Sequence, residues 1–459
     1  MPRCTGQDPR DGLVHIGVVY HGGTVEYWNS RAETMPRDEL ERWQWSRLSR
    51  ALDHARRSSP FWAGRIPDGI TSMAAYTERM PLLRKADLLA SQQASPPYGT
   101  WPSLDPARGV RHHQTSGTSG NPPVRTFDTE RDWKWITDTF CTALYSNGVR
   151  SHHKGLVAFG YGLFAGFWGM HYALERMGCT VVPAGGLDST TVVRLLVDLR
   201  IEVLGLTPSY AMRLIETAGE MGVDLARDAN VQVMLAGAEP RSDFTTRTIE
   251  EAFGARVFNA AGTTEFGGVF MFECPSRRGA CHINEPTVIE EVLHPGTGRP
   301  VGYGEEGVRV TTGLYREGMQ LFRHWTEDIV VKRPHTECGC GRTWDFLDGG
   351  ILRRVDDMRK VRGVSVTPVM IEDVLRGFPE VGEFRSSIRT VRGLDTIHVQ
   401  AEAGVVDGEA AQALRARIAE DFKRQIGIRP QVELSPAGSL PRTRWKAARL
   451  HDERHLAHA

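Results

Sequence analysis

The chain of 459 residues is too long for one compact core, and its 40% hydrophobic and 24% charged residues are ordinary for a globular protein. Its 56 basic and 56 acidic side chains cancel, which excludes the basic field that binds a nucleic-acid backbone. The first ten residues lack the apolar core of a secretory signal, and the 7 cysteines form an odd, clustered set. We therefore expect two or three domains in a reducing, cytoplasmic environment, without a disulfide framework.

Helical and strand patterns alternate over the first part of the chain. Residues 36–57 are predicted to be a helix, because Pro36 suits a first helical position and apolar residues recur on one face from Leu48 to Ala55. Between about 130 and 260, apolar strand candidates alternate with helical stretches, which predicts βαβ units and a largely parallel sheet. The strands are expected at 156–159, 180–183, 203–206, 231–235 and 256–258, and the helices at 190–199, 209–216 and 243–252.

One stretch without acidic or basic residues, 155–174, has the length of a membrane span. Its five glycines and the polar rings of Tyr161 and His171 instead favour a buried strand, a Gly-rich turn and the start of a helix. No membrane partner is therefore expected.

The chain changes character after residue 285. Strand-like residues 288–293 and 307–312 flank a turn-rich stretch, which predicts a meander or a small barrel. From about 357 onward, the pattern indicates a separate small α+β unit. Its helices are expected at 367–376 and 409–426, and its strands at 383–390, 396–403 and 430–434.

These patterns give an α/β fold class with two domains. The large N-terminal domain, residues 1–355, is expected to hold mixed and parallel sheets and the small barrel-like part. The small α+β domain is expected at residues 356–459.

The residues from Thr115 to Pro122 read TSGTSGNP. Glycines let the backbone curl, so that successive N–H groups and hydroxyls point at one anion, as in a phosphate cradle. A Ser/Thr/Gly-rich surface linker is the alternative interpretation. No lysine follows the second glycine, so this is not the common P-loop, and positive charge must come from a metal or from a lysine elsewhere.

Two further groups each follow a predicted strand. They read AGAEP at 236–240 and AGTTE at 261–265, and their small residues let a flat ring lie on the backbone. Thr264 and Glu265 could hold phosphate and Mg²⁺. Either group alone is also compatible with an ordinary strand-to-helix turn.

Charged residues in the last third of the chain could complete a nucleotide site. Asp328 and Arg354 are the residue types that hold ribose hydroxyls, and Lys446 in LPRTRWK could supply the missing positive charge. Exposed surface charges are the alternative for all three.

In this order and spacing the groups resemble the adenylate-forming superfamily of acyl-CoA synthetases, adenylation domains and luciferases, and more closely its phenylacetate–CoA ligase branch. The resemblance runs from about residue 26 to 455. It rests on TSGTSGNP, on YGLF at 161–164, TPSY at 207–210, GAEP at 237–240, C-x-C-G-R at 338–342, DDM at 356–358 and LPR near the end.

The resemblance implies roles for matching residues. Lys446, Thr264 and Glu265 would be catalytic, with Thr264 at the α-phosphate and Glu265 on Mg²⁺. Asp356 would be the hinge of a mobile C-terminal domain that carries Lys446, and Gly363 would lie on the acceptor-side loop. The ATP phosphates would be held by Thr115, Ser116, Gly117, Thr118, Ser119 and Gly120, and the adenine and ribose by Gly237, Ala238, Glu239, Asp328 and Arg354.

The implied reaction is the ATP-dependent activation of an aromatic carboxylic acid. The carboxylate attacks the α-phosphorus, pyrophosphate leaves, and a thiol, most simply that of coenzyme A, then displaces AMP. The C-terminal domain would rotate about Asp356 between the two steps.

An acid pocket is expected where aromatic and small residues meet, because both suit a flat aryl acid. The same side chains could instead belong to the core, and His171 could be a satisfied core histidine. Departures from the family pattern at Ala261 and over 165–168 argue against phenylacetate itself. The candidates are Tyr161, Phe164, Phe167, Trp168, His171, Ala261 and Gly262.

Cysteine and histidine side chains form two clusters, Cys-x6-Cys-His and Cys-x-Cys, whose thiolate and imidazole ligands suit tetrahedral Zn²⁺. Scattered buried thiols are the alternative. The resemblance selects Cys274, His282, Cys338 and Cys340 as ligands of a structural zinc, with Cys281 as a spare or as a replacement for His282.

Two other functions remain open at this point. An aryl-AMP ligase could pass its acyl group to a separate carrier protein, or to an amine or hydroxyl of another aryl acid. A zinc-stabilised nucleotide-binding protein without catalysis is the second alternative, against which the joint presence of Glu265, Asp328 and Lys446 argues. A homodimer is possible, since relatives include dimers, but no sequence feature marks an interface.

Overall fold

The computed structural model describes residues 26–115, 122–239, 242–391, 393–441 and 449–454. Five residues of the predicted phosphate cradle (Ser116, Gly117, Thr118, Ser119 and Gly120) and the predicted catalytic Lys446 lie outside these ranges.

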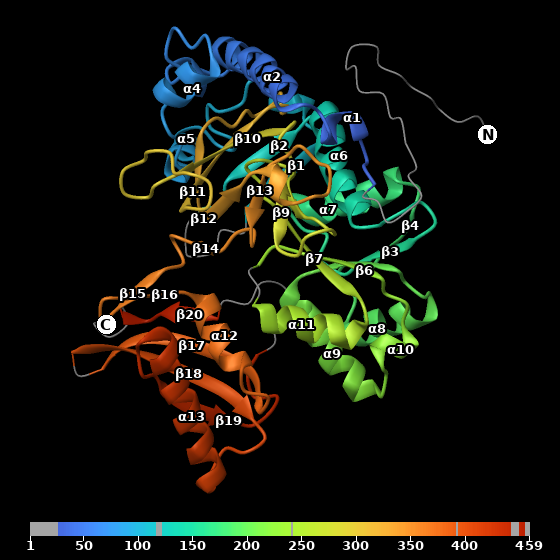
Figure 1. The fold of residues 1–459 in the computed structure, drawn as a ribbon, viewed down its shortest axis with the longest axis vertical. Helices are drawn as coiled ribbons and strands as arrows, with labels where there is room; N and C mark the ends of the chain where they lie inside the picture. The colour runs from blue at the N-terminus through green and yellow to red at the C-terminus, as the bar shows by residue number, and fades with distance from the viewer. Residues whose placement is uncertain (1–25, 116–121, 240–241, 392, 442–448, 455–459) are drawn as a thin grey trace.

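Helices begin the described chain and cover one end of the molecule (Figure 1). The predicted first long helix is α2, which starts at Arg37 because Pro36 serves as its N-cap. The N-terminal helices are α1 (Ser30–Glu33), α2 (Arg37–Ser58), α3 (Pro60–Ala63), α4 (Met73–Arg79) and α5 (Lys85–Ala94). A short hairpin of β1 (Arg111–Gln114) and β2 (Arg125–Asp128) follows.

A single 12-stranded sheet carries the centre of the fold, in the order β10-β11-β12-β13-β9-β8-β7-β6-β5-β3-β4, with β14 paired to β12. The strands β3 to β7 pair in parallel, and the others pair antiparallel. The parallel part comprises β3 (Lys154–Val157), β4 (Thr180–Pro183), β5 (Val203–Leu206), β6 (Val233–Ala236) and β7 (Arg256–Gly262). The antiparallel part comprises β8 (Val269–Glu273), β9 (Ala280–Ile283), β10 (Val288–Leu293), β11 (Glu306–Gly313), β12 (His324–Arg333), β13 (Phe346–Asp348) and β14 (Arg353–Arg354).

The predicted βαβ alternation is confirmed, and the uncharged stretch 155–174 is the strand, turn and helix that its glycines favoured. The helices are α6 (Glu130–Ser146), α7 (Ala165–Arg176), α8 (Ser189–Asp198), α9 (Pro208–Met221), α10 (Leu225–Asp228) and α11 (Asp243–Phe253). Within the described ranges, no helix is long and apolar enough to cross a membrane.

The sheet differs from the sequence prediction most clearly at the end of β7. The strand expected to end at residue 258 continues to Gly262, because its last residues pair antiparallel with β8. Ala-Ala-Gly is a poor strand former by itself, so only the partner strand reveals this extension. The predicted barrel-like part is a meander, in which β10, β11 and β12 continue the large sheet.

Two apolar cores cover the opposite faces of the parallel strands. Successive residues of a strand point to opposite faces, so Val157 and Val203 pack with α6 and α7, whereas Leu156 and Leu204 pack with α8, α9 and α11. This layered arrangement leaves the carboxyl ends of the strands open for a site.

The residues after 356 form a second sheet, in the order β19-β18-β17-β20, with an apolar cluster of its own that begins at Val361 (Figure 1, orange to red). Its strands are β17 (Val381–Val391), β18 (Leu394–Ala403), β19 (Gln431–Ser435) and β20 (Leu450–Asp452). A separate hairpin of β15 (Arg359–Val361) and β16 (Val364–Val366) precedes them. The helices are α12 (Pro368–Arg376) and α13 (Gly408–Ile426). All five elements predicted here are present.

Helix α7 lies close to α6 because it carries a glycine at the contact. A Cβ added at Gly169 would lie 2.3 Å from Cε2 of Phe140, whereas one added at Gly166 of the same helix meets nothing within 4 Å.

We therefore expect Gly169→Ala to lower the free energy of unfolding by about 1–3 kcal/mol, since the added methyl overpacks the α6–α7 contact. Gly166→Ala is the matched control and should be neutral or stabilising by up to about 1 kcal/mol. Urea unfolding measures both, and equal effects of the two substitutions would contradict this account of the contact.

Candidate active site and metal cluster

The two small-residue groups of the predicted nucleotide and acid sites lie side by side at the carboxyl ends of β6 and β7. A Cβ on Gly237 would lie 2.9 Å from the carbonyl oxygen of Ala260. Ala238 adopts φ 72°, which turns the chain, and Glu239 accepts the N–H of Ser209 at 2.6 Å. Ser209 belongs to the TPSY sequence after β5, so the ends of three adjacent parallel strands meet at this edge.

The Thr264–Glu265 turn is held by an arginine that the sequence analysis did not identify. Nη1 of Arg316 donates to the carbonyl oxygens of Thr264 at 3.2 Å and Glu265 at 2.8 Å. Nη2 of Arg316 pairs with Asp128 at 2.6 Å. The turn is therefore fixed through its backbone, which leaves the side chains of Thr264 and Glu265 available for a ligand.

Glu265 is 5% exposed, and Nζ of Lys85 on α5 lies 3.7 Å from its Oε1. The sequence analysis assigned positive charge only to Lys446 and missed Lys85, because a lysine on a distant N-terminal helix gives no local signal. The carboxylate is the ligand type that Mg²⁺ prefers, and the ammonium group of Lys85 is positive charge of the kind that a phosphate attracts.

The base of the predicted phosphate cradle is closed by two hydrogen bonds. Thr115 donates its N–H to the carbonyl oxygen of Val124 at 2.9 Å, and its Oγ1 accepts the N–H of Val124 at 2.9 Å. The N–H of Gln114 donates to the carbonyl oxygen of Leu163 at 2.9 Å. The cradle therefore begins beside the YGLF segment that the sequence assigns to the acid pocket.

Asp328 is 1% exposed on β12 and pairs across the ladder with Arg354 of β14. Its Oδ1 accepts from Nη1 of Arg354 at 2.7 Å, and its Oδ2 lies 3.6 Å from Nη1 of Arg309. Arg309 is itself paired to the buried Glu290, which accepts from Nε at 2.9 Å and Nη2 at 2.5 Å. Two predicted ribose-binding residues are thus in direct contact.

The predicted hinge residue Asp356 joins the same group of charges. Nε and Nη2 of Arg354 each donate to a carboxylate oxygen of Asp356 at 2.8 Å. Burial raises the pKa of Asp328, which Arg354 and Arg309 oppose. Burial would lower the pKa of Arg354, but Asp356 and Asp328 raise it overall. The ion pairs therefore oppose the effect of burial on the pKa of both groups.

Gly363 lies in the two-residue turn between β15 and β16. Both turn residues have positive φ, 50° at Arg362 and 83° at Gly363, as the tight hairpin turn of the I′ type requires. The predicted acceptor-side loop is therefore a rigid hairpin.

The predicted pocket aromatics form one half-buried cluster at the start of α7. The rings of Tyr161 and Trp168 are 4.8 Å apart, and Phe167 stacks on Phe159 with ring centroids 3.5 Å apart. Nδ1 of His171 lies 2.9 Å from the hydroxyl of Tyr161. Nε2 of His171 lies 3.3 Å from Glu175, so both its ring nitrogens have protein partners. This arrangement matches the satisfied histidine among the two sequence interpretations.

Four predicted zinc-binding side chains converge on one buried point. The ligand atoms of Cys274, His282, Cys338 and Cys340 all lie within 4.8 Å of one another. Nε2 of His282 is 3.3 Å from Sγ of Cys338 and 3.2 Å from Sγ of Cys340. Its Nδ1 lies 2.8 Å from the carbonyl oxygen of Trp344, the second contact that fixes a metal-binding imidazole. These residues fit a tetrahedral zinc.

Cys281 points away from this cluster. It precedes His282 on β9, so its side chain projects from the opposite face of the strand, where it packs in the core beneath Gly350. The geometry therefore favours His282 over Cys281 as the fourth ligand.

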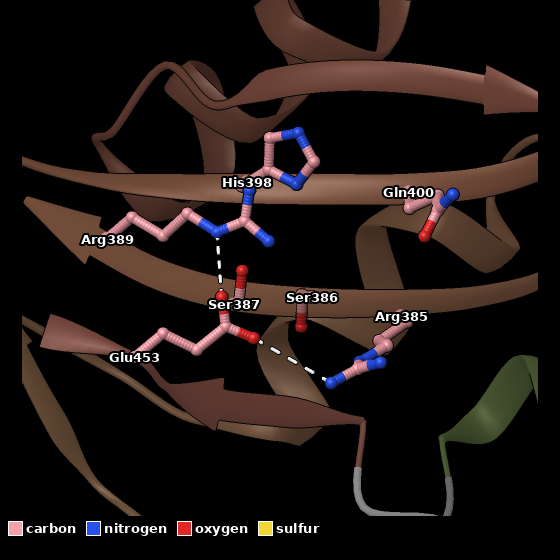
Figure 2. A pocket seen from close by; sticks show the side chains of 7 residues that line it. All are labelled: Arg385, Ser386, Ser387, Arg389, His398, Gln400 and Glu453. Atoms are coloured by element: carbon pink, nitrogen blue, oxygen red, sulfur yellow. Dashed lines mark hydrogen bonds and ion pairs between the residues drawn. The ribbon is translucent and has the colours of Figure 1, made fainter. Parts of the chain in front are cut away.

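A polar pocket on the C-terminal sheet lies apart from these groups (Figure 2). Nε of Arg389 lies 2.7 Å and Nη2 of Arg385 3.7 Å from oxygens of Glu453. The two guanidinium groups thus share the one carboxylate of Glu453, and nothing in the pocket resembles the nucleotide-binding motifs. Its lining residues are Arg385, Ser386, Ser387, Arg389, His398, Gln400 and Glu453.

His324 is the first residue of β12, the strand that carries Asp328, and it is 5% exposed. Neither ring nitrogen has a hydrogen-bond partner in the part of the chain that the structure describes. Burial lowers the pKa of His324 to about 4, against the opposing charge of Glu265. The imidazole is therefore neutral at ordinary assay pH.

This burial predicts a pH dependence of stability. Between about pH 4 and 6.5 the unfolded chain binds a proton at residue 324 that the folded chain does not, so stability rises with pH in this window. Relative to His324→Leu, the wild type should gain about 2–3 kcal/mol of unfolding free energy from about pH 4.5 to 7.5. Urea unfolding across this range measures it, and a constant difference would contradict the burial argument.

The metal cluster predicts that substitution of a ligand cysteine, but not of the nearby buried Cys281, removes the bound zinc. Cys338→Ala removes a proposed ligand, so bound zinc should fall below about 0.2 per chain and the melting temperature should fall. Cys281→Ala is the matched buried control and should keep its zinc. Chelation of the wild type should lower thermal stability before it lowers the activity of the protein that stays folded. Freshly purified protein without zinc would contradict the assignment.

Comparisons with known proteins agree with this geometry. The AMP-binding enzyme family model matches residues 115–320, and the AMP-binding enzyme C-terminal domain model matches residues 363–454. The phenylacetate-coenzyme A ligase of Thermus thermophilus is 33% identical over 435 residues, which are 90% of this chain and 96% of the relative.

A solved structure of 2-hydroxyisobutyryl-CoA ligase with 2-HIB-AMP in the postadenylation state is 28% identical, with a TM-score of 0.87 over 94% of this chain and 93% of that chain. The same enzyme with 2-HIB-AMP and CoA in the thioesterification state has a TM-score of 0.70 at the same identity and coverage. The chain belongs to the phenylacetate–CoA ligase branch of the adenylate-forming AMP-binding enzymes.

Proposed function

We propose that this protein is an AMP-forming acid–thiol ligase that activates an aromatic carboxylic acid with ATP and transfers the acyl group to coenzyme A. The single observation that carries the proposal is that two carboxylates of the predicted nucleotide site, Asp328 and Glu265, are buried and each lies next to a basic side chain. The relatives named for phenylacetate and the CoA-bound relative support the acid class and the acceptor.

In the first step, different residues of the chain would bind the ribose, the adenine and the α-phosphate of ATP. Asp328 and Arg354 would hold the ribose, and the turn at Gly237, Ala238 and Glu239 would flank the adenine. Thr264 would donate to the α-phosphate, where the incoming carboxylate forms the new P–O bond and pyrophosphate departs with its electron pair. Lys446 would bring positive charge against both reacting groups.

Glu265 would hold Mg²⁺, which neutralises phosphate charge when bound, and Lys85 would add a second positive charge beside it. In the second step the thiol attacks the acyl carbon and AMP leaves. We infer that residues 356–459 form the domain that turns about Asp356 to bring the Gly363 hairpin to the acceptor.

The aromatic cluster at the start of α7 supports an aryl acid. Tyr161, Trp168 and Phe167 present half-buried rings beside the strand that leads into the phosphate cradle. His171 is occupied by protein partners, so we place it behind Tyr161, where it orients the phenol ring. Phe164, Ala261 and Gly262 complete the proposed pocket.

Acid-dependent exchange of pyrophosphate into ATP tests the proposal. A panel of benzoic, phenylacetic, hydroxybenzoic and aminobenzoic acids, with 2-hydroxyisobutyric acid included, should give exchange with a subset of the aromatic acids. Exchange with 2-hydroxyisobutyric acid alone would contradict the aryl assignment. Exchange without thioester formation on addition of coenzyme A would favour a carrier protein, or an amine or hydroxyl, as the acceptor.

Lys446→Ala should lower exchange by at least about 100-fold, because it removes charge stabilisation at the reacting groups. ATP binding, measured by equilibrium dialysis, should change less than about threefold, since the other phosphate and ribose contacts remain. Lys423→Ala, an exposed lysine on α13, is the matched control and should exchange like the wild type. Full activity of Lys446→Ala would overturn the assignment.

A further inference from the structure

Glu372 of α12 joins the two parts of the chain at their junction. Its Oε1 accepts a hydrogen bond from Oγ1 of Thr245 on α11 at 2.9 Å and lies 2.7 Å from Nη1 of Arg449. Glu372 is 7% exposed and Thr245 is 2% exposed, so both residues are buried. Figure 1 shows α11 and α12 facing each other there.

Arg449 fixes Glu372 from the C-terminal side. It also reaches Glu383 at 3.5 Å and lies over the ring of Phe384, 4.8 Å from its centroid. Ser386 donates its N–H to the carbonyl oxygen of Arg449 at 2.9 Å, which ties this residue to β17. Glu372 and Arg449 therefore form a buried pair within the C-terminal part, to which Thr245 of the other part donates its hydroxyl.

The orientation in which this contact forms is identifiable. The chain fits the postadenylation state of 2-hydroxyisobutyryl-CoA ligase far better than the thioesterification state of the same enzyme. The sequence identity and the coverage are the same in both comparisons. The difference between the two TM-scores therefore reflects the arrangement of the C-terminal part. The contact between α11 and α12 thus belongs to an arrangement like the postadenylation state, in which acyl-AMP is bound before thioesterification.

We propose that Glu372 is a positioning residue that latches the C-terminal part, through its hydrogen bond to Thr245, in the orientation in which acyl-AMP forms and is held, as opposed to the thioesterification orientation. Rotation about the hinge separates α11 from α12, so this bond stabilises one orientation only, whereas the Glu372–Arg449 pair persists in both. The inference rests on the proposed function, because only a two-step ligase needs the two orientations.

Repulsion at the same junction limits the strength of the latch. Asp373, next to Glu372, has its pKa raised to about 6 by burial and by the charges of Glu372 and Asp243. Asp243 begins α11, so two carboxylates oppose each other where Thr245 and Glu372 attract. A latch balanced in this way can open during each catalytic cycle.

Separate assays of the two half-reactions test the latch. Thr245→Val removes the interdomain hydrogen bond without changing charge, so pyrophosphate exchange should fall about 3–10-fold. Thioester formation from preformed aryl-AMP and coenzyme A should stay within about twofold of the wild type or rise. Glu372→Gln should shift the two rates in the same directions.

Thr248→Val is the matched control. Its hydroxyl donates to the carbonyl oxygen of Phe244 at 3.0 Å, within α11, and should affect neither half-reaction. Small-angle X-ray scattering follows the orientation without activity, and Thr245→Val, but not Thr248→Val, should broaden the distribution of interatomic distances.

Equal loss of both half-reactions in Thr245→Val, or no change in either rate or in scattering, would overturn the latch. If Glu372→Gln fails to fold, Thr245→Val decides the question. A wild type without exchange for any acid would instead refute the proposed function, and the scattering comparison would still test the contact.

Discussion

Asp328 is held between two arginines in the interior, and the proposed nucleotide site depends on this carboxylate. Arg354 bonds one of its oxygens, Arg309 faces the other, and Glu290 neutralises Arg309 in turn. Burial raises the pKa of Glu290 to about 7, against the charge of Arg309. Removal of one member of such a buried set leaves its partner uncompensated, at a cost of about 3–5 kcal/mol.

The same charges connect Asp328 to the proposed hinge residue, Asp356. Arg354 uses one nitrogen for Asp328 and its other two for Asp356, so a ligand that bonds Asp328 would also act on the residue that pairs with the proposed hinge. The proposed zinc cluster would tie the segment after β12, which holds Cys338 and Cys340, to the β8–β9 hairpin.

The sequence predicted those features that have a local signature. Apolar runs between turn residues identified β4, β5 and β10 at their observed bounds, and helical periodicity identified the C-terminal helices. Motifs placed Asp328 beside Arg354 and grouped the metal-binding side chains before any geometry was known.

The features that sequence analysis missed are all contacts between distant segments. Arg316 holds the Thr264–Glu265 turn from another loop, Lys85 reaches Glu265 from an N-terminal helix, and Arg309 meets Glu290 across a ladder. Arginines and lysines are usually exposed, so their burial or pairing is invisible without the fold. The choice between Cys281 and His282 as a zinc ligand likewise required the structure, which shows toward which face of β9 each side chain points.

Oxygen-18 transfer tests the central claim most directly. An aryl acid labelled in both carboxylate oxygens should leave one labelled oxygen in AMP after reaction with ATP and coenzyme A, because the carboxylate oxygen that attacks the α-phosphorus stays with AMP when the thiol displaces it. Mass spectrometry of the nucleotide would show this label together with unlabelled pyrophosphate. Formation of ADP with labelled phosphate, or of unlabelled AMP alongside the thioester, would contradict an acyl-adenylate mechanism.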